Sequence, residues 1–402
     1  MTAPQNITVL GLGRMGTAIA TRLAATGADV TGWTRSGGPH EARAPGRFAA
    51  VPEAKEAVAG ADVVLLALFD AAACREVLDA VDGVVPADAV IVNTATIAPD
   101  EAAALARRPG PAYVHAPVLG SVPAVAAGAV TFLAAAEEPA ALDRVRPVLE
   151  ALGTVRPVDG AATAAALKLV ANHSLAGAVL ALRDALHQAD ALGLPRDQAL
   201  DVLERGQLGG LVSRKRRYLQ DGPPPATAEF TIGALAKDLA LLAGASRLPV
   251  RGGTAPFATP TAASDADIAL AATLPAAPDA AVLAPLRAYV RGHATGDPRH
   301  FREAFLPTAH IEGIRDSVFV SWPLDEYCAL FRGRPAPDEA TRVRRVDTVD
   351  VHGTVATATM TLLHGPDTFT DVFLLVRTGG TWRIANKAYH RHPAPAASSS
   401  AR

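Results

Sequence analysis

Hydrophobic positions in the first 150 or so residues alternate between short β-rich runs and longer Ala/Leu-rich runs with helical spacing. The short runs predict strands at 7–10, 29–33, 63–68, 90–93 and 130–134. The longer runs predict helices at 15–26, 52–59, 71–81 and 100–107. Because strands that alternate with helices are typical of βαβ units, we expect an α/β domain over residues 1–160. We expect its sheet to be doubly wound and parallel, with helices on both faces.

The pattern changes at about residue 161. Residues 161–192 contain no proline and no strand-like run, and their only glycine is Gly177. A single helix of this length would span about 48 Å at 1.5 Å per residue, too long for a compact βαβ unit. We therefore predict an all-helical domain over 161–260 that contains one long helix. Its shorter helical runs lie at 195–205 and 231–245.

A third pattern begins near residue 281. A helical run at 283–292 precedes four runs of alternating polar and apolar residues, at 340–349, 351–363, 369–378 and 381–389. Long strands joined by short turns are typical of antiparallel sheets. We predict an α+β domain with a curved antiparallel sheet over 281–393, a linker over 261–280 and a disordered tail over 394–402.

Charge and composition exclude several classes of protein. The 402 residues include 38 Lys+Arg and 40 Asp+Glu, a balance that argues against a nucleic-acid partner or an anionic membrane surface. The apolar run at 63–69 is far shorter than the ~20 residues of a membrane span. We find no secretion signal at the N-terminus, and the 2 cysteines cannot form a disulfide framework. We expect a soluble, cytoplasmic protein.

Lysine is rare in this chain, so each lysine is a candidate for a dedicated role. Most arginines, by contrast, look like surface residues, and we expect the run 214–217 to be a solvated helix end. The histidines fit no metal-ligand spacing, so we predict no metal site; His310 with Glu312 or Asp316 is a weaker acid/base candidate. The lysines are Lys55, Lys168, Lys215, Lys237 and Lys387.

A glycine-rich turn follows the first predicted strand and opens the first predicted helix. In such a turn the first glycine permits a tight bend, the second lets the backbone approach a pyrophosphate, and the third lets helix and strand pack closely. The free N–H groups at the helix start then bind phosphate. We therefore expect a dinucleotide cofactor. The residues that would contact it are Gly11, Leu12, Gly13, Arg14, Met15 and Gly16.

The end of the second predicted strand bears on the choice of dinucleotide. An acidic residue there binds a ribose 2′-hydroxyl, whereas an arginine suits a 2′-phosphate. The sequence has Thr34, Arg35 and Ser36 at this point, with no acid. We favour NADPH, with NAD as the less favoured cofactor. The alternative interpretation of Arg35 is an ordinary surface arginine.

Four motifs occur in order over the first ~250 residues. They are GLGRMG with WTRS at 33–36, NTATIAP at 93–99, APVLGS at 116–121, and KLVAN at 168–172 followed by Phe230 and Lys237-Asp238. Together they resemble the β-hydroxyacid dehydrogenase family. That family includes 3-hydroxyisobutyrate dehydrogenase and glyoxylate/succinic semialdehyde reductase, with imine reductases as more distant relatives.

The resemblance implies that Lys168 is the general acid/base and that Asn172 helps to hold the substrate. These residues are four apart, so they share one face of a helix. A positioned ammonium can stabilise negative charge on a carbonyl oxygen and supply its proton. The alternative for Lys168 is a solvated helix lysine. The resemblance further implies substrate contacts at Leu119, Gly120, Ser121, Phe230 and Asp238, and cofactor contacts at Leu68, Phe69, Thr96 and Lys237.

The sequence departs from the family pattern in several places. Leu119 replaces a serine of the substrate loop, which favours a less polar substrate end. Asn93 replaces an aspartate, and the match fades by about residue 260, so the helical domain is short. Imine reductases usually carry an acid or tyrosine at the Lys168 position, so Lys168 favours carbonyl chemistry over imine chemistry.

The last ~115 residues carry weaker patterns, among them Leu286-x-x-Tyr289-x-x-Gly292 and the closing run 382–387. These resemble the nuclear-transport-factor-2-like superfamily, whose cone-shaped sheet encloses a pocket used for catalysis, binding or dimerisation. The combined prediction is an NADPH-dependent oxidoreductase, expected to be a homodimer. It would reduce a small aldehyde, semialdehyde or 2-oxo acid, or oxidise the matching hydroxy acid. The alternatives are imine reduction and a non-catalytic nucleotide-binding or assembly protein.

Overall fold

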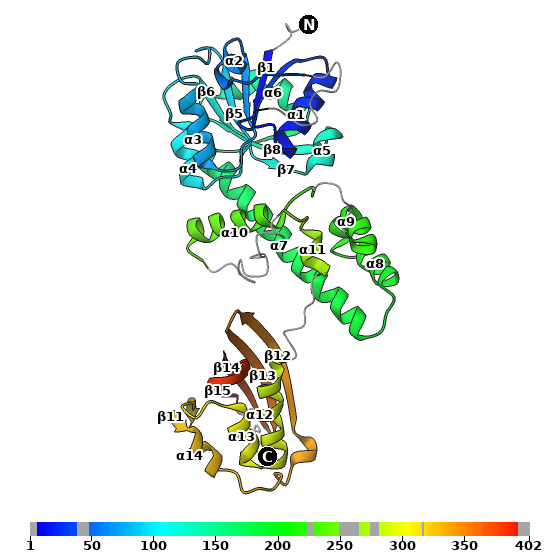
Figure 1. Ribbon diagram of the computed structural model, residues 1–402, viewed down its shortest axis with the longest axis vertical. Helices are drawn as coiled ribbons and strands as arrows, with labels where there is room; N and C mark the ends of the chain where they lie inside the picture. Colours follow the sequence, from blue (N-terminus) through cyan, green and yellow to red (C-terminus); the bar gives the residue numbers. More distant parts are fainter. Residues whose placement is uncertain are drawn as a thin grey trace, which may run out of the picture. The chain divides into compact units, whose positions relative to one another are not determined.

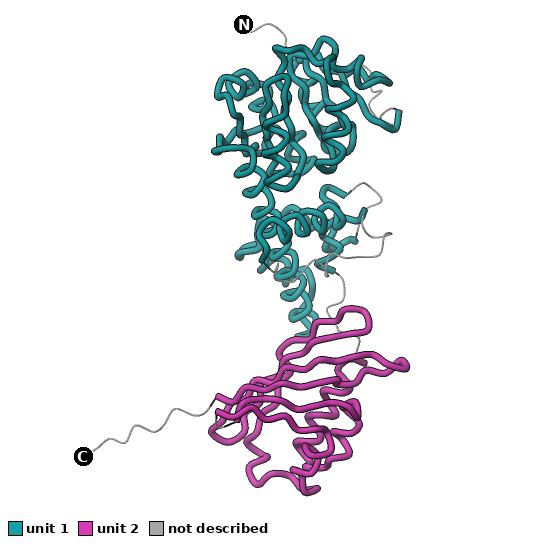
Figure 2. Tube along the Cα trace, turned by 90° about the vertical axis from the view of Figure 1, so that its left-hand side faces the viewer, with its two compact units in different colours: residues 1–274 teal, residues 275–402 magenta. Residues whose placement is uncertain are grey.

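The computed structural model describes residues 6–37, 48–222, 228–248, 265–273, 281–315 and 317–392. The chain divides into two compact units, residues 1–274 and 275–402 (Figure 2). The first unit contains a largely parallel sheet and a helical region, and the second contains a largely antiparallel sheet (Figure 1). The mixed α/β class predicted from the sequence is confirmed. The predicted tail and most of the predicted linker lie outside the described residues.

The sheet of the first unit has the order β3-β2-β1-β4-β5-β6-β8-β7, with β9 paired to β8. Strands β1 to β6 run parallel to one another, but β8 is antiparallel to β6, so the predicted strand at 130–134 is present with the opposite direction. The strands are β1 (Asn6–Leu10), β2 (Asp29–Trp33), β3 (Ala49–Ala50), β4 (Val63–Leu66), β5 (Val90–Asn93), β6 (Ala112–His115), β7 (Val118–Leu119), β8 (Val130–Ala136) and β9 (Gly153–Pro157).

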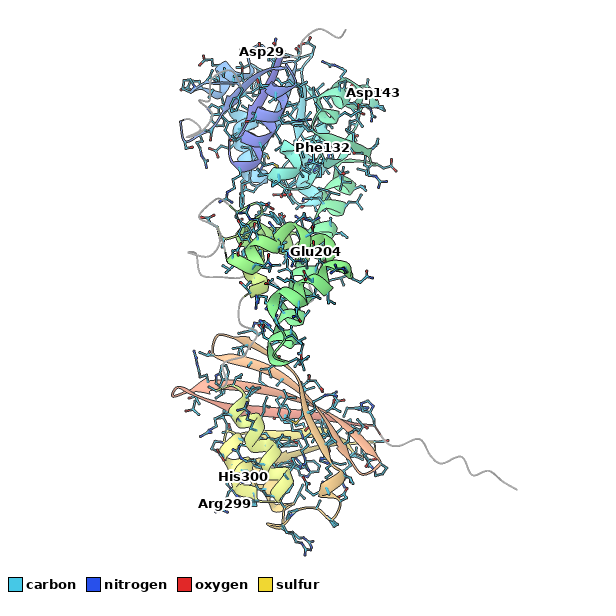
Figure 3. All side chains as sticks on the ribbon, turned by 90° about the vertical axis from the view of Figure 1, so that its right-hand side faces the viewer. Asp29, Phe132, Asp143, Glu204, Arg299 and His300 are labelled. Atoms are coloured by element: carbon cyan, nitrogen blue, oxygen red, sulfur yellow. The ribbon has the colours of Figure 1, made fainter. Side chains whose placement is uncertain are left out.

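Two hydrophobic cores lie on opposite faces of this sheet. One contains side chains of α1 and α6, and the other contains side chains of α2, α3 and α4. Strands β4 and β5 are buried at every position, which explains their continuous apolar sequence. Phe132 lies inside the unit, whereas Asp143 of α6 lies at its surface (Figure 3). The helices are α1 (Arg14–Ala25), α2 (Ala54–Val58), α3 (Ala71–Ala80), α4 (Pro99–Ala106), α5 (Val122–Ala126) and α6 (Pro139–Glu150).

A single helix of 31 residues, α7 (Ala161–Ala191), confirms the predicted long helix. By length and composition alone α7 could cross a membrane, a test that the core helix of a soluble protein also passes. Its buried side chains pack against the sheet near Ala164 and into the helical core near Val179. Around it lie α8 (Arg196–Arg205), α9 (Gly209–Asp221), α10 (Ile232–Ser246) and α11 (Ala269–Thr273).

The second unit has the sheet order β11-β10-β15-β14-β13-β12. Neighbouring strands are antiparallel except β10 and β15, which are parallel. Helix α12 packs on the inner face around the fully buried Tyr289, Phe373 and Trp382. The elements are α12 (Leu283–Thr295), α13 (Pro298–Ala304), β10 (His310–Arg315), β11 (Val318–Pro323), α14 (Leu324–Ala329), η3 (Glu339–Thr341), β12 (Val343–His352), β13 (Val355–His364), β14 (Asp367–Thr378) and β15 (Thr381–His392).

Candidate active site

The glycine-rich turn joins β1 to α1 with two sterically required glycines. Gly11 has φ +105°, and a methyl group built on it would lie 2.5 Å from the Ala67 carbonyl oxygen. A methyl group on Gly16 would lie 1.9 Å from the Gly11 oxygen, so helix and turn pack too closely for any side chain there. At Gly13, by contrast, a methyl group would meet no atom within 4 Å. The backbone is therefore open to a ligand at Gly13, where α1 begins.

This turn fits the pyrophosphate of a dinucleotide. The first N–H groups of a helix have no partner within the helix and favour an anion. Leu12 is buried against Gly32, which leaves Arg14 exposed beside the open backbone and Met15 half-buried. The residues expected to bind the cofactor diphosphate therefore lie together at the carboxyl end of β1, the edge where nucleotides bind in such sheets.

Arg35 lies just beyond β2 and is highly exposed, with 76% of its side chain accessible. Its guanidinium is 3.2 Å from a carboxylate oxygen of Glu76 on α3, whose side chain is 62% exposed. Ion pairs this exposed contribute little, so Arg35 is free to exchange Glu76 for another anion. Thr34 is half-buried and Ser36 is exposed in the turn that follows β2.

Lys168 and Asn172 lie one turn apart near the start of α7, and both are buried. The Lys168 Nζ donates a hydrogen bond to Asn172 Oδ1 at 3.0 Å. Burial lowers the pKa of Lys168 to about 8, while the negative charge of Asp238 raises it and the positive charge of Lys237 lowers it further. The amine is therefore not a solvated helix lysine, and both of its protonation states are accessible near neutral pH.

Asp238 and Lys237 of α10 extend this contact into a network of polar contacts. The Asn172 amide nitrogen donates to Asp238 Oδ2 at 2.5 Å, and Asp238 Oδ1 lies 3.1 Å from Lys237 Nζ. Lys237 Nζ in turn donates to the backbone oxygens of Phe69 at 2.9 Å and Thr96 at 2.7 Å. This network thus connects α7 and α10 to the loops that follow β4 and β5.

The substrate loop predicted from the sequence follows β7. Leu119 is half-buried and packs on the small core formed by Leu133, Ala135 and Ala164. Gly120 has φ +144°, a conformation that only glycine adopts readily, and Ser121 precedes α5 without capping it. Among the described residues, no hydrogen bond joins this loop to the network that contains Lys168. The structure therefore brings Lys168, Asn172, Asp238, Lys237, Phe69 and Thr96 into one network, and it leaves Leu119, Gly120, Ser121, Leu68 and Phe230 outside it.

Asn93, at a position where the resemblance implies an aspartate, is fully buried just before the loop that carries Thr96. Its amide nitrogen donates to the Tyr113 hydroxyl at 2.9 Å, and its oxygen accepts the Ala95 N–H at 2.9 Å. A neutral amide suits this position, because an ionised carboxylate without a cation partner is costly to bury. Asn93 therefore shapes the loop that carries Thr96.

Lys215 contradicts the expectation of a solvated helix end. Only 5% of its side chain is exposed, and its Nζ lies 2.7 Å from Glu229 and 2.9 Å from Asp267. Its neighbour Arg216 follows the expectation more closely and pairs with acids of α8. The hydrophobic pattern of α9 does not reveal the buried lysine, and the rarity of lysine in the chain is the one signal that marks it.

The second unit also contains a buried charged cluster that the sequence did not reveal. Lys387 Nζ lies 2.7 Å from Asp371 Oδ2 and 2.6 Å from the Tyr289 hydroxyl, which donates to the same carboxylate at 2.7 Å. Among the described residues, no hydrogen bond joins the His310 ring to Glu312, and the backbone N–H of His310 donates to Asn386 Oδ1 at 3.1 Å. Asp316 lies outside the described residues. Over the described part of the chain, no three His, Cys, Asp or Glu side chains form a group that could hold a metal ion.

Two protein families match separate parts of this chain. Residues 6–165 match the NAD binding domain of 6-phosphogluconate dehydrogenase, and residues 277–390 match a family described as putative lumazine-binding. A probable 3-hydroxyisobutyrate dehydrogenase of Mycobacterium tuberculosis is 30% identical over 262 residues, which cover 62% of this chain and 88% of that protein. An NAD-dependent L-serine dehydrogenase of Pseudomonas aeruginosa is 29% identical over 215 residues, 51% of this chain and 71% of that protein.

A solved structure shares the fold of about two thirds of this chain. The structure of Mycobacterium tuberculosis 3-hydroxyisobutyrate dehydrogenase with L-serine has a TM-score of 0.56 and 25% identity, and the match covers 68% of this chain and all of that chain. The sequence match extends over most of a dehydrogenase, and the second unit is additional to it. The chain therefore belongs to the β-hydroxyacid dehydrogenase family and is an NAD(P)-dependent oxidoreductase of that type, followed by a nuclear-transport-factor-2-like unit.

Proposed function

We propose that this oxidoreductase interconverts a small carbonyl compound and the matching hydroxy acid with NADPH and NADP, and that Lys168 is its general acid/base. The observation that carries the proposal is the network of polar contacts that runs from Lys168 through Asn172 and Asp238 to Lys237. It ends on the loops after β4 and β5, at the sheet edge where the glycine turn also lies.

The bound cofactor supplies the hydride in the reductive direction. Reduction builds negative charge on the carbonyl oxygen, and the Lys168 ammonium stabilises that charge and donates the proton. In the oxidative direction the neutral Lys168 amine accepts the proton of the alcohol. A pKa of about 8 supports both roles, because neither form of the amine is scarce near neutral pH.

Asn172 orients the amine. Its oxygen accepts one N–H of Lys168, which leaves the other N–H groups of the ammonium for the substrate oxygen. Its amide nitrogen is held by Asp238, so the amide cannot flip without losing both hydrogen bonds. Preorganisation of this kind places a proton donor before the substrate arrives.

The substrate proposed is a small aldehyde, semialdehyde or 2-oxo acid that carries a carboxylate. The backbone around Gly120 and Ser121 can supply N–H groups to that carboxylate, as nests of N–H groups do elsewhere. Leu119 adds an apolar surface where the family has a hydroxyl. The names of the relatives, 3-hydroxyisobutyrate dehydrogenase and L-serine dehydrogenase, support the semialdehyde among these, because it is the carbonyl partner of a short 3-hydroxy acid.

NADPH is proposed over NADH because of Arg35. Its exposed guanidinium stands at the end of β2, where a 2′-phosphate would lie, and its present partner Glu76 holds it weakly.

The test is cofactor consumption against a panel of small aldehydes, semialdehydes, 2-oxo acids and cyclic imines. Wild type, Lys168→Ala and the surface control Lys55→Ala are measured side by side. We expect turnover of a carbonyl compound, a loss of about 10²–10⁴-fold in Lys168→Ala and no loss in Lys55→Ala. Turnover of imines alone, or full activity of Lys168→Ala, would refute the proposal.

A further inference from the structure

We propose that Asp267, held by Lys215, is a positioning residue that sets Phe230 and the start of α10 for substrate binding. The proposal rests on the proposed function, because the family resemblance behind that function also implies the substrate contact at Phe230. Asp267 lies in the short segment 265–273, beyond the point where the resemblance to the family fades.

The Asp267 carboxylate is shared by three parts of the helical region. Its Oδ2 lies 2.9 Å from Lys215 Nζ of α9 and accepts the Glu229 N–H at 3.0 Å and the Phe230 N–H at 3.4 Å. Its Oδ1 accepts the Ala269 N–H at 2.9 Å, at the start of α11. One buried side chain therefore connects α9, the segment that carries Phe230, and α11.

The backbone on both sides of Phe230 is tied to the same segment. The Phe230 oxygen accepts the Ile268 N–H at 3.0 Å, and the Ile232 N–H donates to the Ala266 oxygen at 2.9 Å. Phe230 is thus held at its N–H by the Asp267 carboxylate and at its carbonyl by the residue after Asp267. Its ring is half-buried against the helical core.

Helix α10 begins directly after this anchored residue. Thr231 caps the helix by accepting the Ala234 N–H at 3.1 Å. About two turns later α10 carries Lys237 and Asp238, which contact each other, and Asp238 also accepts the Asn172 amide. A shift in the Phe230 segment therefore moves both the proposed pocket wall and the start of the helix that carries Asp238.

Charge is essential to this arrangement. The Asp267 and Lys215 side chains are 1% and 5% exposed, and charges buried this deeply are costly to leave without an opposite charge beside them. An asparagine at 267 offers one acceptor oxygen, whereas three N–H groups and the ammonium approach the carboxylate. Asp267→Asn must therefore release some of these donors and loosen the Phe230 segment.

The test compares wild type, Asp267→Asn, Phe230→Ala and the double variant. We expect Asp267→Asn to raise the substrate KM by about 10–100-fold while the cofactor KM changes less than about 3-fold. In the Phe230→Ala background, Asp267→Asn adds less than about 3-fold to the substrate KM, because its effect passes through Phe230. A purely structural role would lower stability and add independently in the double variant.

Two further variants keep the test decisive if Asp267→Asn folds poorly. Glu229→Gln weakens only the outer, 27% exposed partner of Lys215 and is expected to give a smaller shift in the same direction. Arg216→Ala is the matched control. Arg216 lies beside Lys215 on α9, and its loss removes the ion pairs to Asp201 and Glu204 of α8 without touching Asp267. If wild type is active and Asp267→Asn leaves the substrate KM unchanged, this inference alone is overturned. Where Asp267→Asn does not fold, an unchanged substrate KM in Glu229→Gln has the same consequence. Wild type without turnover on the whole panel overturns the proposed function and this inference with it.

Discussion

The pH dependence of the two reaction directions tests the assignment of Lys168 most directly. At a pKa of about 8, roughly one tenth of the amine is neutral at pH 7 and roughly nine tenths at pH 9. We therefore expect kcat/KM for oxidation of the hydroxy acid to rise about 10-fold over this interval and then level off. Reduction needs the ammonium and falls over the same interval. A lysine at its ordinary value of 10.5 would give a rise of about 100-fold with no plateau.

Two substitutions move this midpoint in opposite directions. Asp238→Asn removes the negative charge that raises the pKa of Lys168, so the midpoint moves to lower pH. Lys237→Met removes a positive charge that lowers the pKa, so the midpoint moves to higher pH. The assay is kcat/KM from about pH 6 to about pH 10 for all three proteins, because kcat/KM reports the groups of the free enzyme. A midpoint near 10.5, or one that neither substitution moves, would refute the reasoning.

Three other predictions concern the cofactor and stability. Arg35→Ala is expected to raise the KM for NADPH by about 10-fold or more and to leave the KM for NADH unchanged, and equal changes in both would contradict the 2′-phosphate assignment. Lys387→Met leaves the Asp371 carboxylate buried without its cation, so the second unit is expected to lose about 3–5 kcal/mol of unfolding free energy in urea, against no loss for Lys55→Met. Burial lowers the pKa of His115 to about 4, whereas the pKa in the unfolded chain is near 6.5. As pH falls from about 6.5 to about 4 the unfolded chain binds a proton that the folded state does not, so about 3 kcal/mol of unfolding free energy is lost. His115→Leu is expected to flatten this pH dependence, and an unchanged acid limb would contradict it.

The sequence predicts the parts of the fold that depend on contacts between residues close together along the chain. The strand, turn and helix around Gly11 and Gly16 follow from close packing within a few residues, and the spacing of Lys168 and Asn172 follows from helix geometry. The contacts of Lys237 with backbone oxygens of Phe69 and Thr96 join residues more than 140 positions apart, and no periodicity encodes them. The cofactor contacts expected of these three residues rest on the family resemblance alone.

Burial of single charged residues was the least predictable feature. Lys215 stands in a run of basic residues that reads as a solvated surface, and its acid partners Glu229 and Asp267 are distant in sequence. Lys387 stands in an alternating strand, where a polar residue is expected to face water. The direction of β8 could not be predicted either, because an apolar run does not show whether the neighbouring strand is parallel or antiparallel.

The distribution of lysine has a practical consequence for chemistry on the native protein. Lys55 is the one exposed lysine side chain, whereas Lys168, Lys215 and Lys387 are buried and Lys237 is 19% exposed and engaged. Among the five lysines, amine-reactive reagents therefore label the folded protein at Lys55, which gives a single-lysine handle for a fluorophore or a resin. Labelling of the other four lysines over time marks the opening of three regions: the candidate active site for Lys168 and Lys237, the Asp267 segment for Lys215, and the sheet of the second unit for Lys387. Peptide mass mapping of such a time course would rank the stabilities of these three regions in one experiment.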